Sequence, residues 1–427
     1  MKLFKQSCIA WLIFLTFPVL AWAGDRIVVV KVSGAINPVV ANFVSQQISL
    51  ANLAGDELIV IRMDTPGGLD TSMRQIIKAI QTSRIPVATY VAPSGSRAAS
   101  AGTFITIASH IAAMAPGTNI GAAHPVNLMG GGDQSSTMED KIVNDAAAYI
   151  RSLAEQRGRN VYWAELSVKK SVSISAEEAK KLDVIDLVAA DLNALVLAVD
   201  GREVKMGSQT VTLNTRGRDV VYMEMNQRER ILDIISNPNV AYILMMLGIV
   251  GLYFELSNPG LILPGVVGGI SLILALYAMQ TLPINYAGLL LIVLGMVLFI
   301  AEVNVPSFGL LSVGGAISIF LGSIMLIDSD DPTMQISNTV LIPTLLFSVV
   351  LAAGSIYLAG RSYKKRPVSG AEGLIGQSGV VKTELNPDGK VLLHGEIWNA
   401  QSSGKIDVGE KVVVKSIEGL KVIVARQ

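Results

Sequence analysis

The sequence predicts a multidomain membrane protein with an α/β domain, an α-helical transmembrane block and a C-terminal small β-barrel. Three observations predict this class. The first 230 residues alternate short β-branched runs with helical patterns, residues 240–360 carry five acidic and no basic side chains, and residues 367–427 contain short strand-like runs between turn signals. Only 16% of the 427 residues are charged, against about 25% in ordinary soluble domains.

Residues 1–23 have the three parts of a secretory signal peptide. Two lysines precede an apolar run over residues 9–20, which is followed by a small-x-small cleavage pattern at residues 21–23. The alternative is an uncleaved anchor helix, and both interpretations export the segment that follows. Cys8 is the single cysteine, so cleavage would leave no thiol for a disulfide, a cysteine nucleophile or a Cys-ligated metal.

The exported domain is expected to contain parallel strands that alternate with helices. The run from Leu58 to Ile61 is apolar without alternation, which is typical of a strand covered on both faces. Strands are expected over residues 26–32, 57–63 and 86–91, and helices over 70–83, with Asp70 or Thr71 as N-cap, and over 137–157.

Five long apolar runs make up the transmembrane block, each close to the ~20 residues needed to cross ~30 Å of hydrocarbon. Basic residues follow the last run, so an exported N-terminal domain and the positive-inside rule both place the C-terminus in the cytoplasm. The first run is short, and if it lay at the interface, four crossings would reverse that side. The runs cover residues 240–256, 262–282, 285–303, 308–327 and 339–359.

The C-terminal 61 residues, 367–427, are expected to form a small β-barrel of the OB type. Although OB-folds often bind oligonucleotides, Trp398 is the sole aromatic residue of this segment that could stack on a base, and the whole chain has a formal net charge of zero. We therefore predict an interaction module and no nucleic-acid partner. Four or five short strands are expected, four of them over residues 379–383, 390–394, 411–414 and 421–424.

Two glycine- and alanine-rich motifs follow successive predicted strands and are the candidates for chemistry. Residues 64–68 read Asp-Thr-Pro-Gly-Gly, and glycines let backbone N–H groups face a ligand oxyanion. Residues 98–102 read Ala-Ala-Ser-Ala-Gly and place Ser100 among small residues at the start of a predicted helix, whose N-terminus favours negative charge. Each motif alone also fits a plain loop or tight helix packing.

With these motifs in this order, the chain resembles the ClpP/crotonase-like superfamily of serine peptidases, and specifically the NfeD family of membrane-bound serine proteases. The resemblance covers the full chain: an exported peptidase domain over 24–230, a membrane block over 240–360 and an OB-like domain over 367–427. Further matching marks are Met114-Ala115-Pro116-Gly117-Thr118-Asn119-Ile120-Gly121-Ala122 and Asn160 after Arg157-Gly158-Arg159.

The resemblance implies a Ser/Lys dyad in which Ser100 attacks the scissile carbonyl and Lys141 acts as the general base. It also implies that the backbone N–H groups of Gly68 and Ala101 form the oxyanion hole. An ammonium with a pKa near 10.4 cannot accept a proton at neutral pH, so burial would have to lower the pKa of Lys141. The alternative for Lys141 is a solvated surface lysine.

His124 is the competing base, because ClpP-type peptidases use histidine at a similar interval after their serine. A histidine beside proline is more often structural or faces the substrate, so we expect His124 to line the cleft together with Gly67. Residues 125–137 include three consecutive glycines and are expected to be mobile and to cover the site, although a simple linker is the alternative.

The predicted function is therefore a membrane-anchored serine endopeptidase that cleaves apolar segments of stomatin-like (SPFH) proteins. The resemblance implies a multi-pass protein of the prokaryotic inner membrane, in contact with the lipid bilayer, with a periplasmic or extracellular peptidase domain, a cytoplasmic OB-like domain and a homo-oligomeric state. No metal or organic cofactor is implied. The rivals are a non-proteolytic scaffold that organises a stomatin or flotillin-type partner, and a signal-peptide peptidase of the crotonase-like class.

Overall fold

The described residues of the computed structural model divide into two compact units, with the boundary between Val349 and Val350. The expected signal peptide and the three consecutive glycines lie outside the described residues. The described ranges are 26–125, 136–257, 260, 262–280, 282, 284–305, 307, 309–327, 335–363 and 371–427.

A six-stranded parallel sheet forms the centre of the α/β domain, in the order β11-β1-β2-β3-β5-β8. The three predicted strands are confirmed, and β3 is buried along its whole length because helices cover both faces. The strands are β1 (Ile27–Ser33), β2 (Leu58–Asp64), β3 (Val87–Val91), β5 (Ile111–Met114), β8 (Leu187–Val188) and β11 (Val220–Met223).

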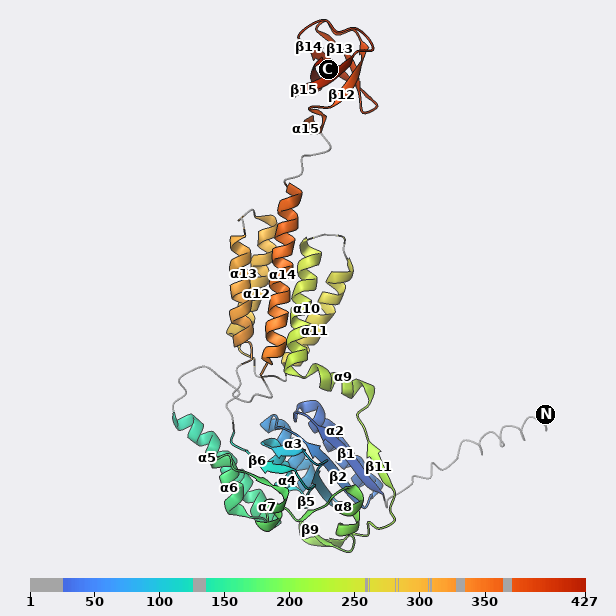
Figure 1. The fold of residues 1–427 in the computed structure, drawn as a ribbon. Helices are drawn as coiled ribbons and strands as arrows, with labels where there is room; N and C mark the ends of the chain where they lie inside the picture. Colours follow the sequence, from blue (N-terminus) through green and yellow to red (C-terminus); the bar gives the residue numbers. More distant parts are fainter. Residues whose placement is uncertain are drawn as a thin grey trace, which may run out of the picture. The chain divides into compact units, whose positions relative to one another are not determined.

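Two apolar clusters lie on opposite faces of this sheet, and Figure 1 shows the helices that cover them. One face packs against α2 (Pro38–Ala54), α3 (Asp70–Gln81), α4 (Ala101–Ala108) and α5 (Ser136–Arg157), and the other packs against α8 (Leu192–Val199). Alternate residues of β1 divide between the two clusters, as the period of a strand requires.

The predicted N-cap of α3 is wrong. The N-cap position is Leu69, which has no capping side chain, and Asp70 is the first helical residue. There the Asp70 carboxylate lies 2.9 Å from Arg74 Nε, one turn further along. A carboxylate in the first turn still interacts favourably with the helix dipole, so the acidic residue serves the helix start in another way.

A small second sheet lies beside the central one and positions the serine motif. It runs in the order β4-β6-β7, formed by β4 (Arg97–Ala99), β6 (Asn119–Gly121) and β7 (Ser173–Ser175). Ser100 occupies the single position between β4 and α4. The remaining elements of the domain are α6 (Val161–Lys169), α7 (Ala176–Lys181), the hairpin β9 (Glu203–Met206) and β10 (Gln209–Thr212), and α9 (Gln227–Ile235).

Five apolar helices occupy the described part of the region expected to span the membrane. By length and composition, α10 and α11 are suited to cross a bilayer, and three shorter apolar stretches lie within α12, α13 and α14. Glycines allow close packing in the hairpins: an added Cβ on Gly251 would lie 2.5 Å from Pro264 O, and one on Gly322 2.6 Å from Gly288 O. The helices are α10 (Pro238–Ser257), α11 (Ile262–Met279), α12 (Tyr286–Asn304), α13 (Leu310–Met325) and α14 (Asn338–Tyr363).

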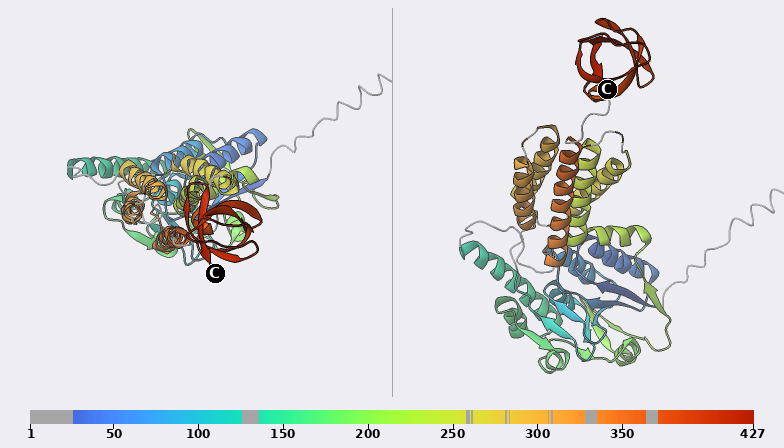
Figure 2. Two further views of the ribbon diagram at one scale, coloured as in Figure 1. Left: turned by 90° about the horizontal axis from the view of Figure 1, so that it is seen from above. Right: turned by 45° about the horizontal axis from the view of Figure 1, so that its top comes forward.

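The C-terminal unit contains a closed barrel in the order β12-β13-β14-β16-β15, whose ring is visible in Figure 2. The four strands predicted by residue range are confirmed, and the fifth strand is β14, for which no range was predicted. Its segment reads Glu-Ile-Trp-Asn-Ala-Gln-Ser and buries only Ala400 and Ser402 fully, so it lacks the usual apolar alternation. The elements are α15 (Ala371–Leu374), β12 (Ser378–Thr383), β13 (Asp388–Leu393), β14 (Glu396–Ser402), β15 (Lys411–Glu418) and β16 (Lys421–Arg426).

Candidate active site

Ser100 lies half-buried in a sharp turn between β4 and α4. Its backbone has φ 50° and ψ −115°, a conformation that a residue with a Cβ seldom adopts. The Ser100 N–H donates to Gly121 O at 3.1 Å. A strained backbone of this kind costs of the order of 1–3 kcal/mol, and such residues cluster at functional sites. The turn leaves the Ser100 side chain at the N-terminus of α4.

Thr103 fixes this turn from within α4. Its fully buried hydroxyl lies 2.9 Å from the carbonyl oxygens of both Ala98 and Gly121, and it accepts the Gly121 N–H at 3.1 Å. Thr103 therefore connects β4, β6 and the first turn of α4. Sequence reasoning missed this residue because a threonine in an apolar helix gives no signal of its hydrogen-bond partners.

The glycine pair of the first motif, Gly67 and Gly68, approaches Ser100 through Gly67. An added Cβ on Gly67 would lie 2.8 Å from Ser100 Cβ, and one on Gly68 would lie 2.5 Å from the backbone nitrogen of Ile36. The chain therefore needs glycine at both positions. Ile36 pairs with this segment through two hydrogen bonds, from its N–H to Gly67 O at 2.8 Å and from the Leu69 N–H to its carbonyl at 3.0 Å.

Two backbone N–H groups, one from each motif, have no hydrogen-bond acceptor among the residues that the structure describes. Within the described ranges, neither the Gly68 N–H nor the Ala101 N–H donates a hydrogen bond. An N–H at the start of a helix has no intrahelical acceptor, which explains the second of them. Unpartnered donors next to a serine hydroxyl are the arrangement that stabilises an oxyanion.

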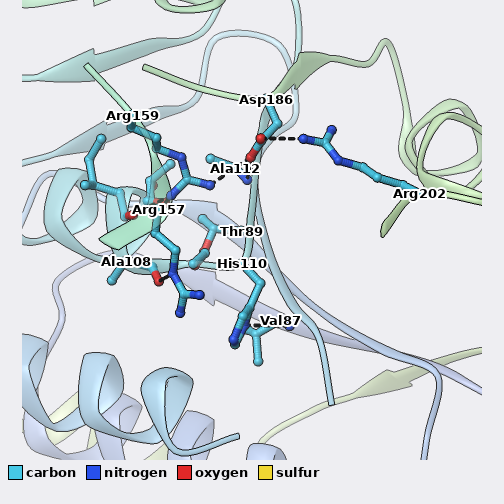
Figure 3. A network of polar contacts seen from close by, with 12 residues as sticks. Val87, Thr89, Ala108, His110, Ala112, Arg157, Arg159, Asp186 and Arg202 are labelled. Carbon is cyan, nitrogen blue, oxygen red and sulfur yellow. Dashed lines mark hydrogen bonds and ion pairs between the residues drawn. The ribbon is translucent and has the colours of Figure 1, made fainter. Parts of the chain in front are cut away.

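A network of arginines holds the other end of α4 (Figure 3). Arg157 Nε donates to Ala108 O at 2.8 Å, while Arg159 donates to Thr106 O at 3.2 Å and to Ile107 O. Cations at a helix C-terminus satisfy its free carbonyls and favour its dipole. Burial lowers the pKa of Arg157 to about 10. The two arginines therefore stabilise the C-terminal end of α4, the end opposite Ser100.

Asp186 compensates part of this buried positive charge. It accepts from Arg159 at 2.8 Å and from Arg202 at 2.6 Å. Burial opposes ionisation of Asp186, but the Arg159 charge and a hydrogen bond from the Ala112 N–H leave its pKa below the usual value. These long-range partners are 27 and 16 residues away in sequence, so spacing gave no sign of them.

His110 lies against the same network and is neutral in the folded protein. Its Nδ1 accepts the Val87 N–H at 3.2 Å. Burial, followed by repulsion from Arg157 and Arg159, lowers its pKa to about 3. An unfolded chain binds this proton below about pH 6.5. The folded state therefore loses stability as the pH falls from about 6.5 toward 3.

We expect His110→Asn to flatten this acid sensitivity, because an amide oxygen can accept the Val87 N–H without titrating. The slope of the unfolding free energy against pH should fall by up to about 1.4 kcal/mol per pH unit between pH 6 and 4. Scanning calorimetry of the α/β domain's transition in the full-length protein measures it. An unchanged slope would contradict the neutral His110.

The structure does not bring Lys141 to Ser100. Lys141 is exposed near the start of α5, and no hydrogen bond joins it to Ser100 among the described residues. The expected burial of Lys141 is therefore not met in this conformation. Later residues of α5, including Val143 and Tyr149, pack against the core.

His124 and Asn160 have structural partners. His124 is half-buried and its Nδ1 lies 2.8 Å from Val168 O, which requires a protonated Nδ1 as donor. Asn160 caps α6 by accepting the Trp163 N–H at 2.9 Å, and its amide donates to Leu182 O. Asn160, one of the positions that carry the family resemblance, is therefore a helix N-cap.

Family models match three successive parts of the chain. Residues 26–207 match the NfeD1b N-terminal domain, residues 239–358 the NfeD integral membrane domain, and residues 371–426 the NfeD-like C-terminal, partner-binding domain. The three matches follow the order of the α/β domain, the apolar helices and the barrel. The chain is therefore a membrane protein.

Two curated relatives align with nearly the whole chain. The "Membrane-bound protease PH1510" of Pyrococcus horikoshii is 39% identical over 97% of this chain and 96% of its own length. The "Membrane protein NfeD1b" of Bacillus subtilis is 26% identical over 94% of this chain and 92% of its own length. Similarity at this level over full lengths establishes the family.

Solved structures of a membrane-bound stomatin-specific protease, 1510-N, also resemble this chain. One, bound to a substrate peptide, carries a lysine-to-alanine substitution and is 38% identical over 49% of this chain and 97% of its own, with a TM-score of 0.45. Another carries a serine-to-alanine substitution, 41 positions before the substituted lysine of the first. It is 37% identical over 48% of this chain and 100% of its own, with a TM-score of 0.45. The chain belongs to the NfeD family of membrane-bound serine proteases.

Proposed function

We propose that Ser100 is the nucleophile of this protease and that Lys141 is its general base. One observation carries the proposal: Ser100 lies in a strained turn at the start of α4, directly beside Gly67, and the Gly68 and Ala101 N–H groups have no acceptor in the described part of the chain. This is the environment in which a serine adds to a carbonyl and the developing oxyanion finds two donors.

The reaction proceeds by acyl transfer. Ser100 Oγ attacks the scissile carbonyl carbon while Lys141 Nζ takes the hydroxyl proton, and the Gly68 and Ala101 N–H groups bind the oxyanion. Collapse of the tetrahedral intermediate breaks the C–N bond, and Lys141 returns the proton to the leaving amine. Lys141 then deprotonates a water molecule, which attacks the acyl carbon. The ester C–O bond breaks, Lys141 returns the proton to Ser100 Oγ, and the acid is released.

This mechanism requires the first turns of α5 to move, because Lys141 is exposed here. Docked beside Ser100, the Lys141 amine would be within reach of the hydroxyl proton. The relative's substituted serine and lysine support the assignment, since their 41-residue separation equals that of positions 100 and 141. Gly67 and His124 are proposed to line the substrate cleft.

The proposed organisation follows the family. A signal peptide over 1–23 precedes a ClpP/crotonase-like peptidase domain over 24–230, five transmembrane helices over 240–360 and an OB-fold domain over 367–427. The peptidase domain would face the periplasm or exterior of a prokaryotic inner membrane and the OB-fold the cytoplasm. The parallel sheet, the apolar helices and the closed barrel support this organisation.

We propose apolar segments of stomatin-like membrane proteins as the substrates, bound by a homo-oligomer in the bilayer. The relative described as stomatin-specific supports this substrate class. The family's C-terminal domain is described as partner-binding, which supports a stable contact with a partner. A peptidase attached to membrane helices would meet such segments at the bilayer surface.

Peptide specificity tests the substrate class. Full-length protein in lipid vesicles should cleave an apolar peptide with a kcat/KM at least about tenfold above that for the same peptide with aspartates at two flanking leucines, because each apolar side chain contributes about 1–3 kcal/mol to discrimination. Equal rates would contradict the apolar specificity. Binding of a stomatin-like protein without any cleavage would favour the scaffold instead.

A further inference from the structure

We infer that Thr65 is a positioning residue that holds the Gly68 N–H in the orientation required for oxyanion binding. The inference rests on the proposed function, because it concerns the proposed oxyanion hole. Thr65 is fully buried and lies in the loop between β2 and the glycine pair. Its side-chain hydroxyl contacts the backbone of Gly67.

The Thr65 hydroxyl binds both polar groups of Gly67. It donates to Gly67 O at 3.0 Å and accepts the Gly67 N–H at 3.1 Å. The Ile36 N–H donates to the same Gly67 O at 2.8 Å. Two donors therefore fix the direction of this carbonyl, one from a backbone that belongs to another segment and one from a side chain.

The geometry of the peptide bond transmits this constraint to Gly68. Gly67 C=O and Gly68 N–H belong to one planar trans peptide unit, in which the two bonds point in opposite directions. Fixing the carbonyl toward Thr65 and Ile36 therefore fixes the N–H away from them. Because Gly67 lies in contact range of Ser100, this peptide plane is adjacent to the nucleophile.

Glycine makes the constraint necessary. Gly67 has φ 136° and Gly68 has φ 157°, and residues without a Cβ rotate between alternative peptide orientations at little steric cost. A rotated peptide would present a carbonyl oxygen, which repels an oxyanion, where the N–H should be. The Thr65 hydroxyl opposes this rotation by satisfying both Gly67 groups in one orientation.

The backbone of Thr65 keeps that hydroxyl in place. The Thr65 N–H donates to Arg97 O at 2.8 Å, and its carbonyl accepts the Ala99 N–H at 3.1 Å. The γ-methyl group packs beside Gly102, where an added Cβ would lie 2.5 Å from it. Thr65 thus connects the glycine pair with the strand that precedes Ser100, so both parts of the site share one anchor.

Thr65→Val tests the inference, because it keeps the shape and removes the hydroxyl. In full-length protein in detergent micelles with a fluorogenic apolar peptide, we expect kcat to fall about 10- to 100-fold with KM changed less than about twofold. The loss should be smaller than the ~10²- to 10³-fold cost of removing an oxyanion donor outright. Thr65→Ser, which retains the hydroxyl, should stay within about threefold of the wild type.

A matched control separates positioning from stability. Thr215 is also fully buried and donates its hydroxyl to a backbone carbonyl, Val196 O at 2.7 Å, on the far side of the sheet. Thr215→Val should lower the melting temperature and leave kcat unchanged. A peptide boronic acid, whose adduct with serine imitates the tetrahedral intermediate, should bind Thr65→Val more weakly by the factor lost in kcat.

Three outcomes would overturn the inference: a Thr65→Val kcat within about twofold of the Thr215→Val value, an equal loss in Thr65→Ser, or a loss confined to KM. If Thr65→Val does not fold, Thr65→Ala provides the same comparison. Ser100→Ala separates a failure of this inference from a failure of the proposed function. An inactive Ser100→Ala with a normal Thr65→Val refutes the positioning role alone, whereas an active Ser100→Ala refutes the proposed function.

Discussion

Ser100→Ala should lower kcat for an apolar peptide by at least about 10⁴-fold. Without the hydroxyl no acyl-enzyme can form, and the remaining oxyanion donors and binding contacts accelerate only the slow attack by water. The measurement is a steady-state assay of the full-length protein in vesicles. Substrate affinity should change little, because the hydroxyl contributes mainly to the transition state.

Ser94→Ala is the control for this loss. Ser94 is exposed in the same connection between β3 and α4, so its removal should leave kcat within about twofold. Comparable melting temperatures of the two variants would show that the fold is intact. Activity retained in Ser100→Ala would place the nucleophile elsewhere and contradict the account.

Lys141→Ala should lower kcat at pH 7 by about 10²- to 10⁴-fold, the contribution of a positioned general base. The amine takes the Ser100 proton in the first step and returns it to the leaving group, so both halves of acyl transfer slow down. Lys141→Arg should be equally inactive, because a guanidinium keeps its proton.

His124→Ala and Lys78→Ala are the comparisons for Lys141. His124 is the alternative base, and retention of most activity in His124→Ala supports the Ser/Lys dyad. Lys78 is an exposed lysine on α3, and its replacement should leave the rate unchanged. A normal rate in Lys141→Ala together with an inactive His124→Ala would reject the lysine and favour a histidine base.

The sequence was sufficient for the secondary structure wherever the apolar pattern was regular. Leu58 to Ile61 predicted a buried parallel strand because burial on both faces leaves no alternation, and β2 confirms it. It was insufficient for β14, where Ala400 and Ser402 face inward and exposed Ile397 faces out, opposite to the usual pattern. Whether such a segment forms a strand depends on closure of the barrel, which involves residues that are distant in the sequence.

The candidate site was predictable in part for a similar reason. Ser100 and Gly68 lie in motifs that follow adjacent strands, so the topology of a parallel sheet brings them to one edge. The hydrogen bonds of Thr65 and Arg159 depend on which backbone carbonyls lie within reach of these side chains, and the local sequence does not reveal such contacts. The position of Lys141 depends on how α5 docks, which stays a prediction.

Covalent labelling tests the central claim most directly. A peptidyl fluorophosphonate should react with the full-length protein at Ser100, identified by mass spectrometry of the modified peptide. Labelling should be fast in wild type and His124→Ala, and slower by at least about 10²-fold in Lys141→Ala. A label on any other residue, or equal labelling rates with and without the amine at position 141, would contradict the account.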